Sequence, residues 1–140
     1  MISTLTCMAV AIYFEARGEP INGQLLVAET IINRVADERW PDTVCGVVKQ
    51  PHQFSFYSDG MSDKPRDMEA YEIAREVAAV ALSGDHLWSG ALYYHTHAVQ
   101  PVWRHDLEVL GQVGAHIFYG NTADCRLPTC SPRSTMRPQR

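Results

Sequence analysis

The stretch AIYFEARGEPINGQLLVAETIINRV, residues 11–35, decides the fold, because it contains the end of one helix, a turn and a second helix. Residues 18–20 supply the Gly and Pro with which a helix stops, and Asn22 can cap the next helix. Upstream, residues 3–16 are apolar on nearly all sides, which predicts a buried helix. Downstream, residues 23–37 place their apolar side chains on one face. The two helices are expected to pack as a hairpin.

The rest of the chain adds shorter elements to this hairpin. Gly, Ser, Asp and aromatic residues mix without a period over residues 51–65, which predicts an ordered loop. The other expected elements are a short helix at 44–49, a long helix at 66–83 and two short strands at 91–96 and 115–119. The predicted fold class is therefore α+β and mostly α, with a compact helical domain and a small β-sheet within residues 1–120.

The composition is typical of one globular domain. The chain has 140 residues, of which 46% are hydrophobic and 20% are charged, so a disordered chain is excluded. The longest apolar run, residues 5–14, is too short to cross a membrane, so no membrane insertion is expected. No Lys or Arg precedes that run, and acidic residues follow it where a cleavage site would lie. We therefore expect no signal peptide in this sequence.

Charge is divided unevenly along the chain. Residues 121–140 carry four Arg and one Asp, and the whole chain has a net charge of -4, so residues 1–120 carry -7. Such an acidic body is a poor binder of nucleic acid, and no nucleic-acid partner is expected. The last twenty residues are rich in Pro and Ser and are expected to form a flexible basic tail after the domain.

The four cysteines show no CxxC spacing and therefore no zinc-ligand pattern. Cys7 lies within an apolar run, where a buried free thiol that packs as a small hydrophobe is expected. Cys125 and Cys130 form the close pair, and a disulfide between them remains open.

Glu15 is the most informative residue, because no charged side chain precedes it in the chain. On a helix it stacks over Ala11 and Ile12, so its carboxylate faces an apolar wall. Desolvation raises the pKa of a carboxyl group, which is how a Glu is kept protonated for acid catalysis on a glycosidic bond. The alternative is a Glu at a helix end that pairs with Arg17 or Arg34.

Two further glutamates are weaker candidates. Glu19 lies in the turn and is expected to be solvated, with a possible role in capping the second helix. Glu29 borders the apolar face of the second helix, where a glycosidase could hold a second carboxylate. An ion pair at the surface or between helices is the more ordinary interpretation of Glu29.

The histidines and aromatic residues offer two different kinds of site. His95 and His97 point the same way on a strand, and with His116 they could form a three-ligand zinc site. Histidines that form hydrogen bonds or bind sugar are the more ordinary interpretation. Aromatic residues interleave with Gln53, Asn33 and His in the manner of carbohydrate sites, because a sugar has apolar C–H faces and hydroxyl edges. Tyr94 and Trp103 are the aromatic residues that we expect in the cleft.

Eight short motifs, in this order, resemble the SleB/CwlJ cell wall hydrolase family. They are AIYFEARGEP (11–20), GQ (23–24), VA (27–28), INRV (32–35), QFS (53–55), GALYYHT (90–96), VxPxW (99–103) and GxHxFY (114–119). The resemblance implies a mostly helical fold with a small antiparallel sheet, related to lysozyme-like transglycosylases, and peptidoglycan glycan strands as the substrate. The catalytic glutamate of the family's EARGE motif falls on Glu15.

Two departures from the family limit this comparison. Glu29 replaces a residue that is commonly small or neutral, so no role is transferred to it. SleB-type members usually carry an export signal and often a separate wall-binding domain. A lone catalytic domain without a signal fits a phage-type enzyme that is made in the cytoplasm and released during lysis, and export by an unrecognised route is the alternative.

The sequence thus predicts a monomeric peptidoglycan lytic transglycosylase that needs no cofactor and cuts the MurNAc–GlcNAc bond with Glu15 as general acid and base. Substrate-binding roles are predicted for Gln24, Asn33, Gln53, Phe54, Tyr94, His95, Trp103 and His116. Two alternatives remain open: a zinc-dependent amidase or peptidase that uses His95, His97 and His116, and a non-catalytic wall-binding module.

Overall fold

A computed structural model describes residues 3–50, 64–84, 90–96 and 107–120. Within these ranges the chain forms four helices and three strands, which are α1 (Thr4–Ala16), α2 (Ile21–Val35), α3 (Val44–Val48), α4 (Met68–Leu82), β1 (Ala91–Thr96), β2 (Glu108–Val113) and β3 (His116–Gly120). This is the mostly helical α+β class that the sequence predicts. The tail at 121–140, with Cys125 and Cys130, lies outside the described residues, as does nearly all of the predicted loop at 51–65.

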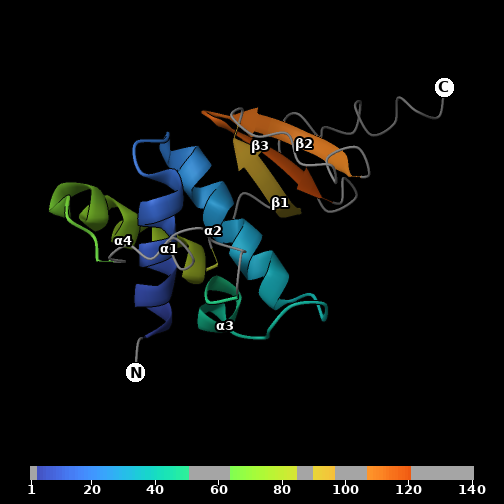
Figure 1. Cartoon of the computed structure of the whole chain (residues 1–140), viewed down its shortest axis with the longest axis horizontal. Coiled ribbons are helices and arrows are strands. Elements are labelled where there is room, and N and C mark those ends of the chain that lie inside the picture. Colours follow the sequence, from blue (N-terminus) through green and yellow to red (C-terminus); the bar gives the residue numbers. More distant parts are fainter. Residues whose placement is uncertain (1–2, 51–63, 85–89, 97–106, 121–140) are drawn as a thin grey trace.

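The first helix, α1, is the central helix of the structure. It begins at the N-cap residue Ser3, whose hydroxyl accepts a hydrogen bond from the amide of Thr6 over 3.1 Å. It packs against α2, α3 and α4 and is buried on most sides, as its sequence predicts. Figure 1 shows α1 between α4 and α2. No helix in the described ranges is long and apolar enough to cross a membrane.

The second helix begins two residues before the predicted start. Pro20 is at the N-cap position and accepts the first helical hydrogen bond, from the amide of Gln24 over 3.0 Å. Asn22 lies inside the first turn, so its predicted capping role is wrong. The reason is local, because the fixed φ of a proline suits a helix start. Gly18, with a φ of 85°, makes the turn that reverses the chain between α1 and α2.

The apolar core is closed by a disulfide that the sequence did not reveal. Cys7 of α1 is bonded to Cys45 of α3, with the two Cα atoms 5.3 Å apart. The prediction of a free thiol at Cys7 is therefore wrong. Cys7 is nearly fully buried, as expected, but the packing of α3 on α1 brings Cys45 to its sulfur.

The sheet is antiparallel with the strand order β1-β3-β2. The middle strand β3 begins one residue later than predicted, because Gly114 and Ala115 form the turn from β2. The sequence did not predict β2. The register of β2 with β3 is interrupted near Gly111, and the apolar Val109 is 58% exposed. The strand therefore lacks the alternation of buried apolar and exposed polar side chains by which a half-buried strand is predicted.

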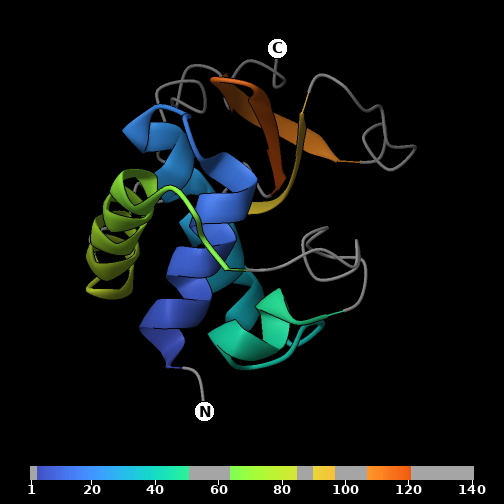
Figure 2. The same cartoon turned by 60° about the vertical axis from the view of Figure 1, so that its left-hand side comes forward.

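The sheet packs against the end of α1 and the side of α2. Phe118 of β3 and Leu110 of β2 are buried with Ala16, Leu26 and Val27 in a second apolar cluster. Figures 1 and 2 show the sheet at one end of the helical layer, beside α2 and the end of α1. This arrangement places the last turn of α1 directly against β1.

Candidate active site

A partly buried carboxylate meets a tyrosine hydroxyl where α1 ends against the sheet. Tyr94 of β1 donates a hydrogen bond of 2.9 Å to Oε1 of Glu15, which lies in the last turn of α1. Burial raises the pKa of Glu15, and the hydrogen bond from Tyr94 acts in the opposite direction. Glu15 therefore keeps its proton to a higher pH than an exposed glutamate does. A general acid requires this property.

Both arginines that the sequence offered as partners of Glu15 are occupied elsewhere. Arg17 donates to the hydroxyl of Tyr13 and lies over its ring. Arg34 donates through Nε to the carbonyl of Leu92 over 2.8 Å. The alternative interpretation, an ion pair between Glu15 and one of these arginines, is therefore wrong. Ala11 and Ile12 are fully buried, so the apolar wall beside Glu15 is present as predicted.

Tyr94 is held in place by two side chains on the same face of the sheet. It lies opposite Phe118 in the register of β1 and β3, and Thr96 lies opposite His116. Residues directly opposite each other in an antiparallel pair share a face. The Tyr94 ring meets the edge of His116 at a centroid distance of 5.0 Å and Phe118 at 5.6 Å. Burial and the Glu15 carboxylate raise the pKa of Tyr94 well above its usual value, so its hydroxyl remains a donor.

His116 supports Tyr94 and is itself buried, with 3% of its surface exposed. Its Nδ1 has no hydrogen-bond partner among the described residues and lies 4.0 Å from Oε1 of Glu19. Burial lowers the pKa of His116, although the Glu19 carboxylate acts in the opposite direction. His116 is therefore neutral at pH 7 and packs against Tyr94 as an uncharged ring.

Glu19 connects the turn after α1 to the turn between β2 and β3. Its Oε1 accepts a hydrogen bond of 2.8 Å from the amide of Ala115. The prediction of a solvated Glu19 is therefore wrong, because its carboxylate reaches across to the sheet. Gly114 makes this approach possible, since a Cβ at that position would lie 2.1 Å from Glu19 Oε1. A glycine just before a predicted strand was the available signal for this close approach.

The start of β1 is fixed by α2. Asn33 donates through Nδ2 to the carbonyl of Ala91 over 2.8 Å, next to the bond from Arg34 to Leu92. Asn33 was predicted to bind substrate, and the structure engages its amide nitrogen with β1. Both bonds anchor the strand that carries Tyr94, so they set the position of the Tyr94 hydroxyl relative to Glu15.

His95 lies on the other face of the sheet from His116. It is opposite Ile117 in the register, and its Nε2 lies 2.8 Å from the hydroxyl of Tyr119. His95 and His116 therefore point to different faces, which contradicts the zinc set that joins them with His97. His97 lies outside the described residues. Within the described part of the chain, no three His, Cys, Asp or Glu side chains are placed to hold a metal ion.

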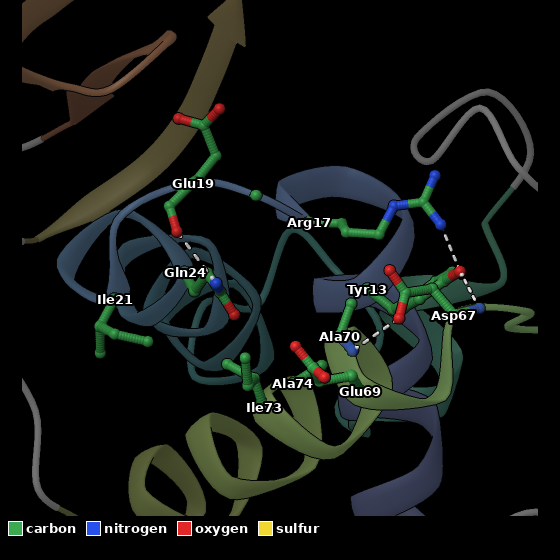
Figure 3. A pocket seen from close by; sticks show the side chains of 11 residues that line it. Tyr13, Arg17, Glu19, Ile21, Gln24, Asp67, Glu69, Ala70, Ile73 and Ala74 are labelled. Atoms are coloured by element: carbon green, nitrogen blue, oxygen red, sulfur yellow. Dashed lines mark hydrogen bonds between the residues drawn. The ribbon is translucent and has the colours of Figure 1, made fainter.

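The remaining predicted residues lie apart from Glu15 or outside the described residues. Gln24 is buried and lines a cavity of about 270 Å³ on the α4 side of α1, with Tyr13 and Arg17 (Figure 3). Glu29 is 2% exposed, so a surface ion pair for it is wrong. Gln53, Phe54 and Trp103 lie outside the described residues.

Comparison with known proteins now identifies the family to which this fold and site belong. The family described as Cell Wall Hydrolase matches residues 18–119. The chain belongs to the cell wall hydrolase family. Glu15 lies three residues before the matched range.

Cell wall hydrolases of known name align over most of this chain. The spore cortex-lytic enzyme of Oceanobacillus iheyensis is 38% identical over 112 residues, which are 79% of this chain and 39% of that protein. The spore cortex-lytic enzyme of Bacillus subtilis is 36% identical over 113 residues, which are 79% of this chain and 35% of that protein. The chain thus spans well under half the length of these relatives.

Solved catalytic domains share both sequence and fold with this cell wall hydrolase. The catalytic domain of the germination-specific lytic transglycosylase SleB from Bacillus anthracis is 33% identical, with a TM-score of 0.71 over 83% of this chain and 93% of that domain. The catalytic domain of Bacillus cereus SleB is also 33% identical, with a TM-score of 0.72 over 83% of this chain and 88% of that domain. These structures confirm the predicted fold.

Proposed function

We propose that this chain cleaves the glycan strands of peptidoglycan as a lytic transglycosylase, with Glu15 as general acid and base. The observation that carries the proposal is the partly buried Glu15 carboxyl group, which has a raised pKa and a hydrogen bond of 2.9 Å from Tyr94. The names of the related proteins, spore cortex-lytic enzyme and lytic transglycosylase, support the same substrate and reaction.

The reaction needs one carboxyl group in two protonation states. Neutral Glu15 protonates the glycosidic oxygen between MurNAc and GlcNAc, and the bond to C1 of MurNAc breaks. The resulting Glu15 carboxylate takes the proton of the MurNAc C6 hydroxyl, whose oxygen bonds to C1 and closes a 1,6-anhydro ring. The proton returns to Glu15, so the step balances without water.

The engagement of Glu19 and the burial of Glu29 favour this single-carboxylate route. Hydrolysis in the manner of a muramidase uses a second carboxylate about 5 to 9.5 Å from the first. Glu19 is bonded to the amide of Ala115, and Glu29 is buried in α2, so neither is a free carboxylate beside Glu15. Tyr94 is a positioning residue in this mechanism, because its hydroxyl orients the Glu15 carboxyl group.

The decisive experiment compares two matched substitutions in lysis of purified sacculi. Glu15→Gln keeps the shape of the side chain but cannot donate the proton, so we expect lysis to be lost while binding to sacculi remains. Glu29→Gln, the control, is expected to keep most of the activity. More than a few per cent of activity in Glu15→Gln would contradict the assignment. Equal loss in Glu29→Gln would instead require a mechanism with two carboxylates.

A chelator separates this proposal from a zinc amidase or peptidase. Turnover by a carboxylate alone does not change when EDTA is added. Loss of activity in EDTA, with one zinc ion per purified chain, would favour the amidase. Loss of lysis in Glu15→Gln with sacculus binding intact would exclude the third interpretation, a wall-binding module without catalysis.

A further inference from the structure

The cavity lined by Gln24 lies on the far side of α1 from the catalytic carboxyl group. Tyr13 lines it, and Glu15 does not. Residues two positions apart on an α-helix point about 200° away from each other, since each residue turns the helix by about 100°. The cavity is therefore separate from the site where Glu15 meets Tyr94. Its volume, about 270 Å³, is slightly below the range of about 300 to 1,000 Å³ usual for drug-sized ligands.

The polar side of this cavity presents acceptors. Gln24 is 5% exposed, and its Nε2 donates to the carbonyl of Glu19 over 3.0 Å. Because that carbonyl can only accept, the orientation of the amide is fixed and Oε1 faces the cavity. Oε1 receives no hydrogen bond from the described residues, although the side chain is more than nine-tenths buried. This oxygen can accept a hydrogen bond from a ligand in the cavity.

Two carboxylates add to this acceptor character. Glu69 is in the first turn of α4 and has no ion pair or hydrogen bond among the described residues. Figure 3 shows its carboxylate on the cavity side of α4, facing Gln24. Asp67 also lines the cavity, and only its Oδ1 is engaged, by the amide of Ala70 over 3.1 Å. Arg17 also lines the cavity, but its guanidinium group donates to the hydroxyl of Tyr13 and forms no ion pair with Glu69 among the described residues.

The apolar side of the cavity suits an alkyl chain. Ala70 and Ala74 of α4 lie in its wall, and Ile21 and Ile73 stand at its mouth. Ile21 is 51% exposed and Ile73 is 38% exposed. Exposed isoleucines on both sides of a polar cavity indicate a ligand with an apolar stem, because burial of those surfaces on binding is favourable.

We infer that this cavity binds a primary ammonium group on an alkyl chain, supplied by the diamino acid of a peptidoglycan stem peptide. Glu69 and the Gln24 carbonyl accept the ammonium hydrogens, and the isoleucines cover the alkyl stem. The choice of a stem peptide as the source rests on the proposed function, whereas the alkylammonium chemistry rests on the cavity alone. The catalytic site would hold the glycan, and this cavity would hold a peptide attached to it.

The test measures binding of the peptide L-Ala-γ-D-Glu-L-Lys to the full chain by isothermal titration calorimetry. We expect the peptide to bind, and acetylation of the lysine amine to abolish binding. Glu69→Gln should weaken binding by up to about fivefold, the upper size of one exposed ion pair. The control Glu76→Gln removes the same charge from an exposed position on α4 outside the cavity lining and should leave binding unchanged.

A second pair of variants tests the apolar mouth without altering buried groups. Ile73→Lys places a cation at the cavity and should abolish binding. Val80→Lys makes the same change at another exposed position of α4, 42% exposed, and should have no effect. Equal binding of the acetylated peptide, or equal effects within either pair of variants, would overturn the inference.

Cadaverine, a free alkyl diamine, distinguishes the source of the ammonium group. Binding of the tripeptide at least fivefold tighter than cadaverine supports a stem peptide, and equal binding overturns that assignment. The outcome is separable from the proposed function. Sacculi that are degraded while the tripeptide fails to bind refute the cavity assignment alone. Tripeptide binding by a chain that does not degrade sacculi refutes the proposed function alone.

Discussion

Removal of the Tyr94 hydroxyl should shift the pH dependence of lysis. Tyr94→Phe keeps the ring against His116 and Phe118 but deletes the hydrogen bond of 2.9 Å to Glu15. That bond stabilises the ionised form of Glu15, so its loss raises the pKa of a carboxyl group that burial has already raised.

The size of the shift follows from the strength of one hydrogen bond to a charged group. Such bonds are worth about 1.5 to 3 kcal/mol, and one pKa unit corresponds to about 1.4 kcal/mol. Loss of the Tyr94 bond should therefore raise the pKa of Glu15 by about 1 to 2 units. Because the general acid must be protonated, the alkaline limb of the rate profile should move upward by the same amount.

The assay is the pH profile of kcat/KM for release of soluble fragments from purified sacculi. We expect Tyr94→Phe to have lower activity, because the carboxyl group loses its orienting partner, with the alkaline limb at higher pH. Tyr71→Phe removes a tyrosine hydroxyl from α4, far along the chain from Glu15, and should reproduce the wild-type profile. An alkaline limb that stays in place or moves downward in Tyr94→Phe would refute the reasoning.

Three further predictions concern stability. Because the pKa of Glu15 is raised, the free energy of unfolding falls as pH rises through that pKa. Glu15→Gln should therefore be as stable as the wild type in acid and more stable than the wild type at neutral pH. Denaturant melts in which the difference between the two proteins does not change with pH would contradict this. The Cys7–Cys45 disulfide closes a loop with a sequence separation of 38. Its reduction should lower the free energy of unfolding in urea by about 4 kcal/mol. An unchanged urea midpoint in the presence of reductant would contradict the disulfide. Gly114→Ala and Gly84→Ala both place a side chain at positive φ, but only the Cβ at position 114 meets Glu19. Thermal melts should therefore show a larger fall in Tm for Gly114→Ala. Equal falls in Tm would exclude the close approach of Glu19.

The sequence predicted the helical frame and the apolar surroundings of Glu15 because both depend on local patterns. Residues 3–16 are apolar on nearly all sides, and a helix at the centre of the structure satisfies that pattern. A single carboxylate at the end of such a helix meets a low-dielectric environment wherever the other elements pack. Tyr94, one of the two aromatic residues expected in the cleft, donates its hydroxyl hydrogen bond to Glu15, and its predicted contact with substrate stays a prediction.

The features that the sequence missed depend on contacts between distant segments. The bond between Cys7 and Cys45 arises from the packing of α3 on α1, which spacing does not encode. Glu19 looked solvated because it lies in a turn, and only the tertiary fold brings the amide of Ala115 to its carboxylate. The register that separates His95 from His116 likewise depends on how β1 pairs with β3, so the zinc hypothesis remained open until that pairing was known.

The measurement that tests the central claim most directly is mass spectrometry of the muropeptides released from purified sacculi. The account predicts fragments that end in 1,6-anhydro-MurNAc, each lighter by one water than the corresponding hydrolysis product, and none of them with Glu15→Gln. Fragments with reducing MurNAc ends would show that water, and not the C6 hydroxyl, attacks C1. Free stem peptides with intact glycan strands would contradict glycan cleavage altogether.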